Sequence, residues 1–370
     1  MTSTPSSPQV RGPRRLLVTG GAGFIGSNFV HHWAKTHPQD RLVVLDALTY
    51  AGNRNSLAAL EGGENFRFVQ GDIGDRPLLD ELLATESINT VAHFAAESHV
   101  DRSIIAPDAF IQTNVVGTFT LLEAFRHYWQ QADFSALPAK KWAFLHISTD
   151  EVYGSLGDRD PAFAETTPYA PNSPYSASKA ASDHLVRAYH HTYGIPIVIG
   201  HCSNNYGPYQ FPEKLIPLTC INILMGKPIP VYGDGKHIRD WLYVEDHCRA
   251  LDVLIHKGNR GQRYNIGGNN EVRNIELVHI ICQLMDDMAV DLPTRPARDL
   301  ITYVDDRLGH DRRYAINARK MSIQLGWNPV TGIEEGLRET VRWYLDHRDW
   351  WEPLLTGEYQ QFYQKMYGLV

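Results

Sequence analysis

Short apolar runs alternate with segments of helical periodicity through residues 16–200. Six runs are predicted as strands: Leu16–Thr19, Leu42–Asp46, Phe66–Gln70, Thr90–Phe94, Ala143–Ser148 and Ile197–Gly200. Helical patterns follow the first strand as far as Lys35 and recur at Asn114–Tyr128 and Tyr175–Tyr193, where Gly194 and Pro196 stop the last one. Apolar, β-branched strands alternating with helices predict an α/β fold, a doubly wound parallel sheet of Rossmann type covered on both faces.

The alternation weakens after residue 200, where five prolines occur within 23 residues: Pro208, Pro212, Pro217, Pro228 and Pro230. A chain of 370 residues also exceeds the usual size of one hydrophobic core. We therefore predict a flexible tail at 1–15 and a first domain, built on the parallel sheet, at 16–200, to which the chain returns at about 245–270. Residues 201–244 and 271–370 are predicted to form a smaller α/β lobe that binds the substrate.

Composition narrows the class of protein. Hydrophobic residues make up 43% and charged residues 21%, as in ordinary globular proteins. No apolar run is long enough to cross a bilayer and no secretory signal is evident, so we expect a cytoplasmic protein without a membrane partner. The net charge of −7 argues against a nucleic-acid partner. Four scattered cysteines predict core thiols, and the absence of an HExxH motif, together with diverging histidine pairs, predicts no metal.

A glycine-rich turn, Thr19–Gly26, joins the first predicted strand to the first helix. Gly20, Gly23 and Gly26 allow the backbone to approach a pyrophosphate at the helix N-terminus. Asp46 ends the second strand, where a carboxylate binds ribose hydroxyls and repels a 2′-phosphate. The pattern therefore favours NAD over NADP, with Asp72 and Ile73 after the third strand as contacts for the adenine.

Tyr175 and Lys179 lie four residues apart at the start of a predicted helix and project from one face. A free tyrosine is a poor base at neutral pH because its pKa is about 10. An adjacent ammonium, with a positive nicotinamide nearby, stabilises the phenolate and lowers this pKa. Such a pair also occurs on exposed helices, but Ser173-Pro174 before it and the glycine turn upstream favour catalysis.

The segment His146–Gly154 carries Thr149, Asp150 and Glu151 at the end of the fifth predicted strand. Hydride transfer needs only a hydroxyl there, which Thr149 supplies. Two adjacent acids are typical of an elimination, in which one group removes a proton beside a carbonyl and another protonates the departing hydroxyl. A turn with two solvated acids is the alternative.

These motifs resemble a known family. The glycine spacing, Asp72 and the Tyr-x-x-x-Lys motif resemble the extended short-chain dehydrogenases/reductases. Five longer blocks are similar to the dTDP-glucose 4,6-dehydratase family within that group, over residues 16–343: Ala95–Ser103, Ser148–Gly154, Asn204–Tyr209, Pro212–Pro217 and Arg239–His247. The resemblance implies an NAD-dependent hydro-lyase of deoxysugar (rhamnose) biosynthesis.

The family's chemistry implies a role for each catalytic residue. Tyr175 takes the proton of the sugar 4-hydroxyl, Lys179 supports it and holds the nicotinamide ribose, and Thr149 hydrogen-bonds the 4-oxygen. Glu151 then removes the C5 proton while Asp150 protonates the 6-hydroxyl, so that water leaves. The implied product is dTDP-4-keto-6-deoxyglucose, formed with NAD bound throughout.

Further contacts follow from the resemblance. The cofactor contacts it implies are Phe24, Ile25, Asp46, Leu48, Thr49, Asp72, Ile73, Ala95, Ala96, Ser98, Thr113, Tyr175 and Lys179. The substrate contacts it implies are Ser98, His99, Thr149, Asn204, Lys214, Leu215, Arg239, Arg307 and His310, with Asn265 as the amide in preference to Asn274. Leu308 replaces the proline that the family pattern has in this loop, which removes a fixed φ angle beside Arg307.

The resemblance also implies a homodimer through a four-helix bundle. Six apolar residues of the two long helices fit such a face or the sheet equally: Leu121, Leu122, Phe125, Leu185, Val186 and Tyr189. Three other functions share parts of the pattern. A nucleotide-sugar 4-epimerase needs no acid pair, a 4,6-dehydratase for another nucleotide sugar differs only in base recognition, and a non-catalytic NAD sensor needs no Tyr-Lys pair.

Overall fold

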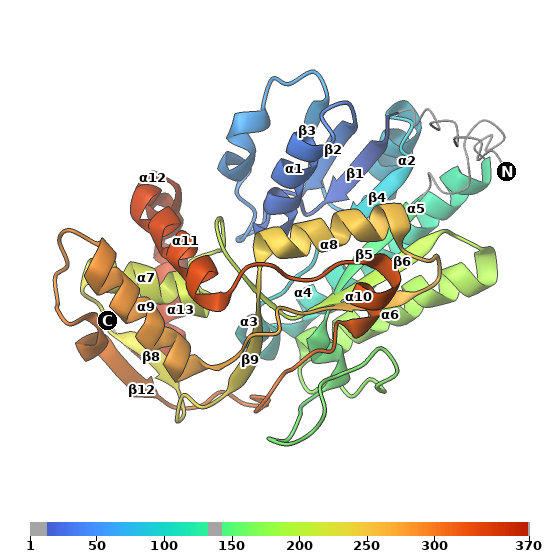
Figure 1. The fold of residues 1–370 in the computed structure, drawn as a ribbon. Coiled ribbons are helices and arrows are strands. Elements are labelled where there is room, and N and C mark those ends of the chain that lie inside the picture. Colours follow the sequence, from blue (N-terminus) through green and yellow to red (C-terminus); the bar gives the residue numbers. More distant parts are fainter. Residues whose placement is uncertain (1–12, 132–142, 369–370) are drawn as a thin grey trace, which may run out of the picture.

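The computed structural model describes residues 13–131 and 143–368. Most of the predicted tail, residues 1–12, lies outside the described residues. Two units lie side by side in Figure 1: a large sheet with its helices, and a smaller group of helices and short strands.

Seven parallel strands form the central sheet, in the order β10-β6-β5-β4-β1-β2-β3. Their bounds are β1 (Arg15–Thr19), β2 (Arg41–Asp46), β3 (Phe66–Gln70), β4 (Thr90–His93), β5 (Ala143–Thr149), β6 (Ile197–Cys202) and β10 (Arg263–Ile266). The order runs outward from β1 in both directions, so the fold is the predicted doubly wound one. Every residue of β4, β5 and β6 is buried, as a sheet covered on both faces requires.

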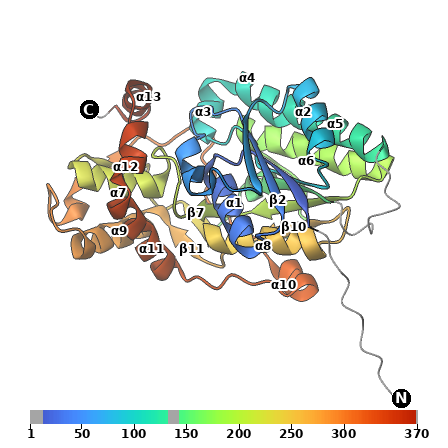
Figure 2. The ribbon, with the colours of Figure 1, turned by 90° about the horizontal axis from the view of Figure 1, so that it is seen from above.

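Alternate side chains of each strand face opposite layers of helices. Leu16 and Val18 of β1 pack with α1 (Phe24–Thr36), α8 (Val244–Lys257) and α10 (Arg319–Leu325). Leu17 between them packs with α2 (Arg76–Thr85), α5 (Thr118–Gln131) and α6 (Pro174–Tyr193). Figure 2 shows these two layers on either side of the sheet. This alternation follows from the two-residue period of a strand.

The smaller unit has a core of its own, around Ile221, Trp241 and Ile281. Short sheets of three strands (β11-β9-β7) and two strands (β12-β8) border it. The strands are β7 (Asn204–Tyr206), β8 (Ile229–Tyr232), β9 (Ile238–Tyr243), β11 (Glu271–Arg273) and β12 (Ile301–Val304). The helices are α7 (Leu215–Met225), α9 (Asn274–Met288), α11 (Ile333–Asp346), α12 (Arg348–Trp351) and α13 (Gly357–Tyr367).

The remaining short elements connect these parts. α3 (Val100–Ile105), α4 (Pro107–Phe110) and the π-helical segment η2 (Ile111–Gly117) lead into α5. The 3₁₀ turns are η1 (Arg54–Leu60), η5 (Asp150–Tyr153), η6 (Ala297–Leu300) and η7 (Glu352–Leu354). Within the described part of the chain, no helix has both the length and the apolarity needed to span a bilayer.

The six strands predicted from the hydrophobic pattern are confirmed to within two residues at each end. The predicted helix Asn114–Tyr128 is helical throughout, but its first turn, as far as Gly117, is π-helical, and regular α-helix runs from Thr118 to Gln131. β10 and α8, after residue 240, belong to the central sheet and its covering layer, while the domain boundaries remain a prediction. All four cysteines are buried free thiols, as predicted.

Candidate active site

A cavity of about 310 Å³ opens along the carboxyl edge of the central sheet, where parallel α/β sheets bind their ligands. It is lined by the ends of β1, β2, β4, β5 and β6 and by the first turns of α1 and α6. Of the residues predicted from the sequence, those lining it are Gly20, Gly23, Phe24, Ile25, Gly26, Asp46, Thr49, Asp72, Ile73, Ala95, Ala96, Ser98, Thr113, Thr149, Glu151, Tyr175, Lys179, Asn204 and Lys214.

The glycine turn brings bare backbone to one end of this cavity. Gly20 has φ of +70°, and a Cβ there would lie 2.5 Å from the backbone N of Ala95. A Cβ on Gly26 would lie 2.2 Å from the carbonyl O of Gly20. Side chains at either position would therefore clash, and only glycine lets the chain turn this tightly into α1. Such a turn at a helix N-terminus is a cradle for an anionic phosphate.

Asp46, at the end of β2, lines the cavity close to the glycine turn. Its Oδ2 accepts a hydrogen bond from the N–H of Ala22 at 2.9 Å, and its Oδ1 accepts one from the N–H of Leu48 at 2.8 Å. Burial raises the pKa of Asp46, and these two bonds oppose the rise. Leu48 takes a left-handed conformation, with φ of +53°. Leu48 itself does not line the cavity, although its neighbours Ala47 and Thr49 do. The carboxylate thus ties the glycine turn to the loop after β2.

The first two turns of α6 present Tyr175 and Lys179 to the cavity. Ser173 caps this helix by accepting a hydrogen bond from the N–H of Ser176 at 3.1 Å, and Pro174 occupies its first turn. Tyr175 and Lys179 are 9% and 5% exposed. The Nζ of Lys179 donates to the carbonyl O of Ile147 in β5 at 2.8 Å, which orients the lysine along the cavity wall.

The protein groups around Tyr175 shift its pKa in the direction opposite to the predicted lowering, and the lowering by Lys179 together with a bound nicotinamide stays a prediction. Burial raises the pKa of Tyr175 well above its ordinary value, and the Glu151 carboxylate raises it further, while a hydrogen bond with Thr149 lowers it. Burial also lowers the pKa of Lys179. Desolvation penalises both charged forms, so this pair needs a further positive charge to favour the phenolate.

Thr149, Asp150 and Glu151 lie where β5 passes into the turn η5. The hydroxyl of Thr149 accepts a hydrogen bond from the N–H of Glu151 at 3.3 Å and donates to Oδ1 of Asp150 at 3.4 Å. Thr149 and Glu151 line the cavity, whereas Asp150 lies behind them, 1% exposed. Among the described residues, Oδ2 of Asp150 has no hydrogen-bond partner. A buried carboxyl oxygen without a partner is costly when ionised and poised to carry a proton.

The two acids differ in their electrostatic surroundings. Burial raises the pKa of Asp150 well above its ordinary value, and Glu151 and Asp240 raise it further. Burial also raises the pKa of Glu151, but the cations Arg307, Arg239 and Lys214 oppose the rise. The pKa of Asp150 is therefore raised more strongly than that of Glu151, so Glu151 is the first of the two to give up its proton. One acid and one base on adjacent residues is what an elimination requires.

Three predicted substrate residues do not line the cavity, although two of them, Arg239 and Arg307, act electrostatically on Glu151. Arg239 is 4% exposed, donates to the carbonyl O of Asp311 at 2.9 Å and lies over the ring of Tyr314. Nη1 of Arg307 lies 3.3 Å from Oδ1 of Asp101. His310 contacts Asp306 at 2.5 Å. Leu308 is 79% exposed beside Arg307, so the residue that replaces the family's proline points to solvent.

Three other predicted residues also lie outside the cavity. His99 is buried, with Nε2 3.8 Å from Oε1 of Glu213. Leu215 begins α7 next to Lys214. Asn265 is fully buried in β10, where its amide accepts from the hydroxyl of Tyr153 at 2.9 Å and donates to the carbonyl O of Phe163 at 2.9 Å. Both ends of this amide are engaged, so the structure does not bring Asn265 to the cavity.

Two acidic residues of the cavity were not predicted as site residues. Glu97 and Glu213 line it, and burial raises the pKa of each. Glu213 accepts a hydrogen bond from Nε of Arg102 at 3.0 Å. Both acids stand beside predicted contacts, Ser98 and Lys214, so the sequence blocks contained them but indicated no role.

A buried polar network supports the end of β5 from behind. Asp183 of α6 accepts hydrogen bonds from Ser148 at 2.9 Å and from His201 at 2.9 Å, and lies 3.2 Å from Nε2 of His146. Burial raises the pKa of Asp183, but His201 and His146 outweigh it, so the pKa is lowered. These residues come from three separate elements, and no local motif could have revealed the network.

Comparisons with known protein families, sequences and structures all find nucleotide-sugar dehydratases. A family model described as GDP-mannose 4,6 dehydratase matches residues 17–340. A dTDP-glucose 4,6-dehydratase of Xanthomonas campestris is 57% identical over 347 residues, 93% of this chain and 97% of its own. One from Escherichia coli K12 is 52% identical over 95% of this chain and 99% of its own. The crystal structure of one from Streptomyces venezuelae, with NAD bound, superposes with a TM-score of 0.83 at 46% identity, covering 92% and 99%.

Proposed function

The chain belongs to the dTDP-glucose 4,6-dehydratase family, and on this premise we propose that it converts dTDP-glucose into dTDP-4-keto-6-deoxyglucose and water. One observation carries the elimination step: the buried Asp150 and the cavity-lining Glu151 adjoin Thr149 at the end of β5, and both carboxyl groups act electrostatically on Tyr175. A plain hydride-transfer enzyme would need the tyrosine and the threonine alone.

The cofactor is NAD. The bare backbone at Gly20 and Gly26 fits a pyrophosphate, and the Asp46 carboxylate fits ribose hydroxyls while repelling a 2′-phosphate. NAD, when bound, accepts hydride from C4, returns it to C6, and brings positive charge near Tyr175. That positive charge stabilises the phenolate form of Tyr175. It therefore opposes the rise in pKa that burial and Glu151 cause.

The chain's own groups move the protons. Tyr175 takes the proton of the 4-hydroxyl, and Thr149 holds the 4-oxygen by a hydrogen bond. Glu151, whose negative charge Arg307, Arg239 and Lys214 stabilise against the effect of burial, removes the C5 proton once C4 is a ketone. Asp150, kept protonated by burial, gives its proton to the departing 6-hydroxyl. Lys179 holds the nicotinamide ribose.

The substrate's diphosphate is assigned to Arg239 and Arg307, because a planar guanidinium binds phosphate oxygens in pairs. Ser98, Asn204 and Lys214 contact the sugar nucleotide from the cavity wall. His99, Leu215 and His310 support these contacts from the layer behind. The enzyme acts in the cytoplasm, where the four buried thiols stay reduced.

We propose a homodimer whose interface lies outside the core. Leu121, Leu122 and Phe125 are fully buried against the sheet, which removes them from any interface. Other apolar side chains on the consecutive elements α3, η2 and α5 are exposed by 37% to 47%: Ile104, Ile105, Ile111, Val116 and Phe119. Exposed apolar residues concentrated on neighbouring helices are typical of a helical dimer face.

Substrate turnover in heavy water tests the reaction. The purified protein is incubated in D₂O with dTDP-glucose, UDP-glucose or GDP-mannose, and products are followed by NMR. We expect dTDP-glucose alone to give rapid formation of a 4-keto-6-deoxy sugar carrying solvent deuterium at C5. A 4-hydroxy product without deuterium at C5 would instead identify an epimerase, and preference for another nucleotide would refute the substrate.

A further inference from the structure

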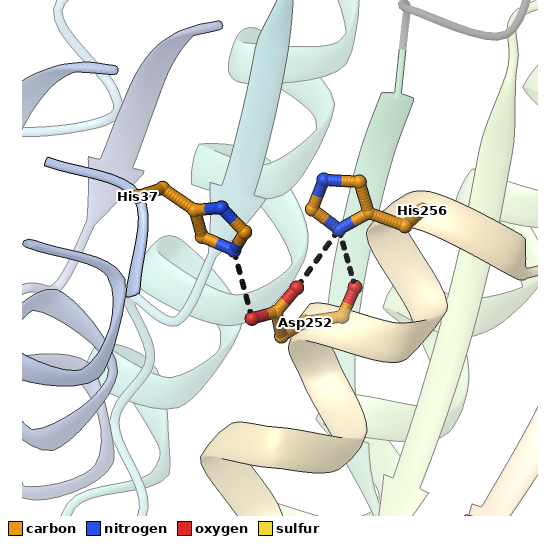
Figure 3. A group of neighbouring side chains, drawn as sticks. All are labelled: His37, Asp252 and His256. Carbon is orange, nitrogen blue, oxygen red and sulfur yellow. Dashed lines mark hydrogen bonds and ion pairs between the residues drawn. The ribbon is translucent and has the colours of Figure 1, made fainter. Parts of the chain in front are cut away.

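Four side chains on the far face of the sheet share one polar cluster, and the mechanism uses none of them. Nε2 of His37 lies 2.9 Å from Oδ2 of Asp252, and Nε2 of His32 lies 3.0 Å from the same oxygen. Nδ1 of His256 lies 2.8 Å from the other oxygen, Oδ1. Figure 3 shows His37 and His256 converging on the carboxylate from opposite sides. None of the four lines the active-site cavity.

The cluster joins two helices that are far apart in the sequence. His32 belongs to α1 and His37 follows its last residue, whereas Asp252 and His256 lie four residues apart on one face of α8. α1 ends at Thr36 and α8 ends at Lys257, so two helix C-termini meet here. The negative end of each helix dipole favours a cation at this place.

The arrangement has the chemistry of a metal site. One ligand atom from each of His37, Asp252 and His256 lies within 4.8 Å of the others, and His32 contacts the same carboxylate from outside this group of three. Two imidazoles and one carboxylate are three ligands that a borderline divalent ion such as Zn²⁺ accepts, with a water molecule completing its tetrahedral geometry. The four side chains are only 16% to 26% exposed, so the cluster is partly shielded from water.

The indole ring of Trp33 packs against two of these histidines and limits how they can move. The ring of Trp33, which is fully buried, stacks on His256 at 5.4 Å with an interplanar angle of 9° and contacts His37 at 4.4 Å. Ligands held by packing lose little conformational freedom when an ion binds. Burial raises the pKa of Asp252, but hydrogen bonds from His256, His32 and His37 outweigh it and lower the pKa, so the carboxylate is ionised.

We propose that His37, Asp252 and His256 bind one divalent transition-metal ion, with Zn²⁺ as the probe of choice, at the junction of α1 and α8, where His32 hydrogen-bonds the ligating carboxylate. Histidine ligands bind a metal ion only in their neutral form, so binding competes with protons and weakens at acid pH. To reach Zn–N distances of about 2.0–2.1 Å the ligand atoms contract around the ion.

The ion has a structural role. α1 has 13 residues and is therefore about 20 Å long, which separates the cluster from the glycine turn at its other end. Metal binding therefore stabilises the packing of α1 on α8, and hence the frame of the nucleotide site, without touching the reacting atoms.

Zinc titration of the holoenzyme tests the proposal. After treatment with a chelator, the protein is titrated with Zn²⁺ by calorimetry at pH 7.5 and 5.5, and its Tm is measured with and without the ion. We expect one ion per chain, tighter binding at the higher pH, a Tm raised by several degrees, and turnover of dTDP-glucose unchanged. Co²⁺ serves as a second probe, because its visible absorption reports the number and kind of its ligands.

Variants assign the ion to its ligands. The double substitution His37→Gln with His256→Gln should weaken Zn²⁺ binding by at least about tenfold and abolish the rise in Tm. The control removes two exposed histidines elsewhere, His191→Gln with His279→Gln, and should bind as the parent does. Circular dichroism and turnover confirm that both variants are folded. Equal affinity in the two double variants, or no saturable binding by the parent chain, would overturn the proposal.

Discussion

Asp150 and Glu151 are chemically similar neighbours placed in different surroundings. Asp150 is buried with one oxygen unpartnered among the described residues, while Glu151 faces three cations. Burial alone would protonate both, and the cations decide which of the two ionises first. A difference in proton affinity on adjacent residues thus supplies an acid and a base within one turn.

We expect Glu151→Gln to stop the reaction after the first oxidation. The amide keeps the shape but cannot remove the C5 proton, so product formation should fall by about 10²–10⁴-fold. Tyr175 is untouched, so the absorbance of reduced nicotinamide should still appear on adding dTDP-glucose. Tyr175→Phe is the matched comparison, because it should show neither reduced nicotinamide nor product. Normal turnover by the Glu151 variant would remove this residue from the mechanism.

At the scale of elements, the N-terminus of α6 connects helix stability with catalysis. The capping box of Ser173 and Ser176 fixes where the helix starts, and Tyr175 lies in its first turn. Fraying of that turn would displace the phenol from Thr149, with which it shares a hydrogen bond.

We expect Ser173→Ala to lower both stability and turnover. Loss of an N-cap costs about 0.5–2 kcal/mol, and the displaced Tyr175 should reduce kcat more than it changes KM. Thr356→Ala provides the control, since Thr356 caps α13 by accepting from the N–H of Tyr359 at 3.3 Å, away from the cavity. Denaturant unfolding and steady-state kinetics measure both effects. An equal loss of kcat in the control would show that the effect is one of general stability.

At the scale of the whole molecule, the same helical region contributes side chains both to the core and to the proposed dimer face. Leu121, Leu122 and Phe125 turn inward to the sheet, whereas Ile111 and Phe119 point to solvent. The π-helical segment η2 precedes α5 and changes the rotation of residues along the axis.

We expect Ile111→Asp with Phe119→Asp to produce a monomer. Two charges in an apolar helical interface would be desolvated without partners, which opposes association. Light scattering after size-exclusion chromatography should give the mass of one chain instead of two. Ile323→Asp is the control, because Ile323 is 69% exposed on α10, at a distance from the proposed face, and should leave the dimer intact. A dimer that persists in the double variant would contradict the assignment of this face.

Local order along the chain determined much of this protein. The strands, the glycine turn, Asp46, the Tyr175–Lys179 pair and the acids after β5 are all recognisable within short windows. The direction in which each of these side chains points follows from its position in a strand or helix, because the period of the element fixes which residues share a face. Parallel strands then bring their carboxyl ends to one edge, so residues read separately meet in one cavity.

Only the tertiary structure decided features that depend on packing between distant segments. It engaged the amide of Asn265 in internal hydrogen bonds, raised the pKa of Tyr175 by burial, and turned Leu121 inward. It also brought His37 to Asp252 across 215 residues, where no spacing along the chain pointed to a metal site. Burial and long-range contacts exist only in the folded protein. The desolvation of a buried group depends on all the elements that pack around it, and not on its neighbours in the sequence. A linear pattern therefore predicts which groups can react, while their proton affinities and distant partners exist only after folding.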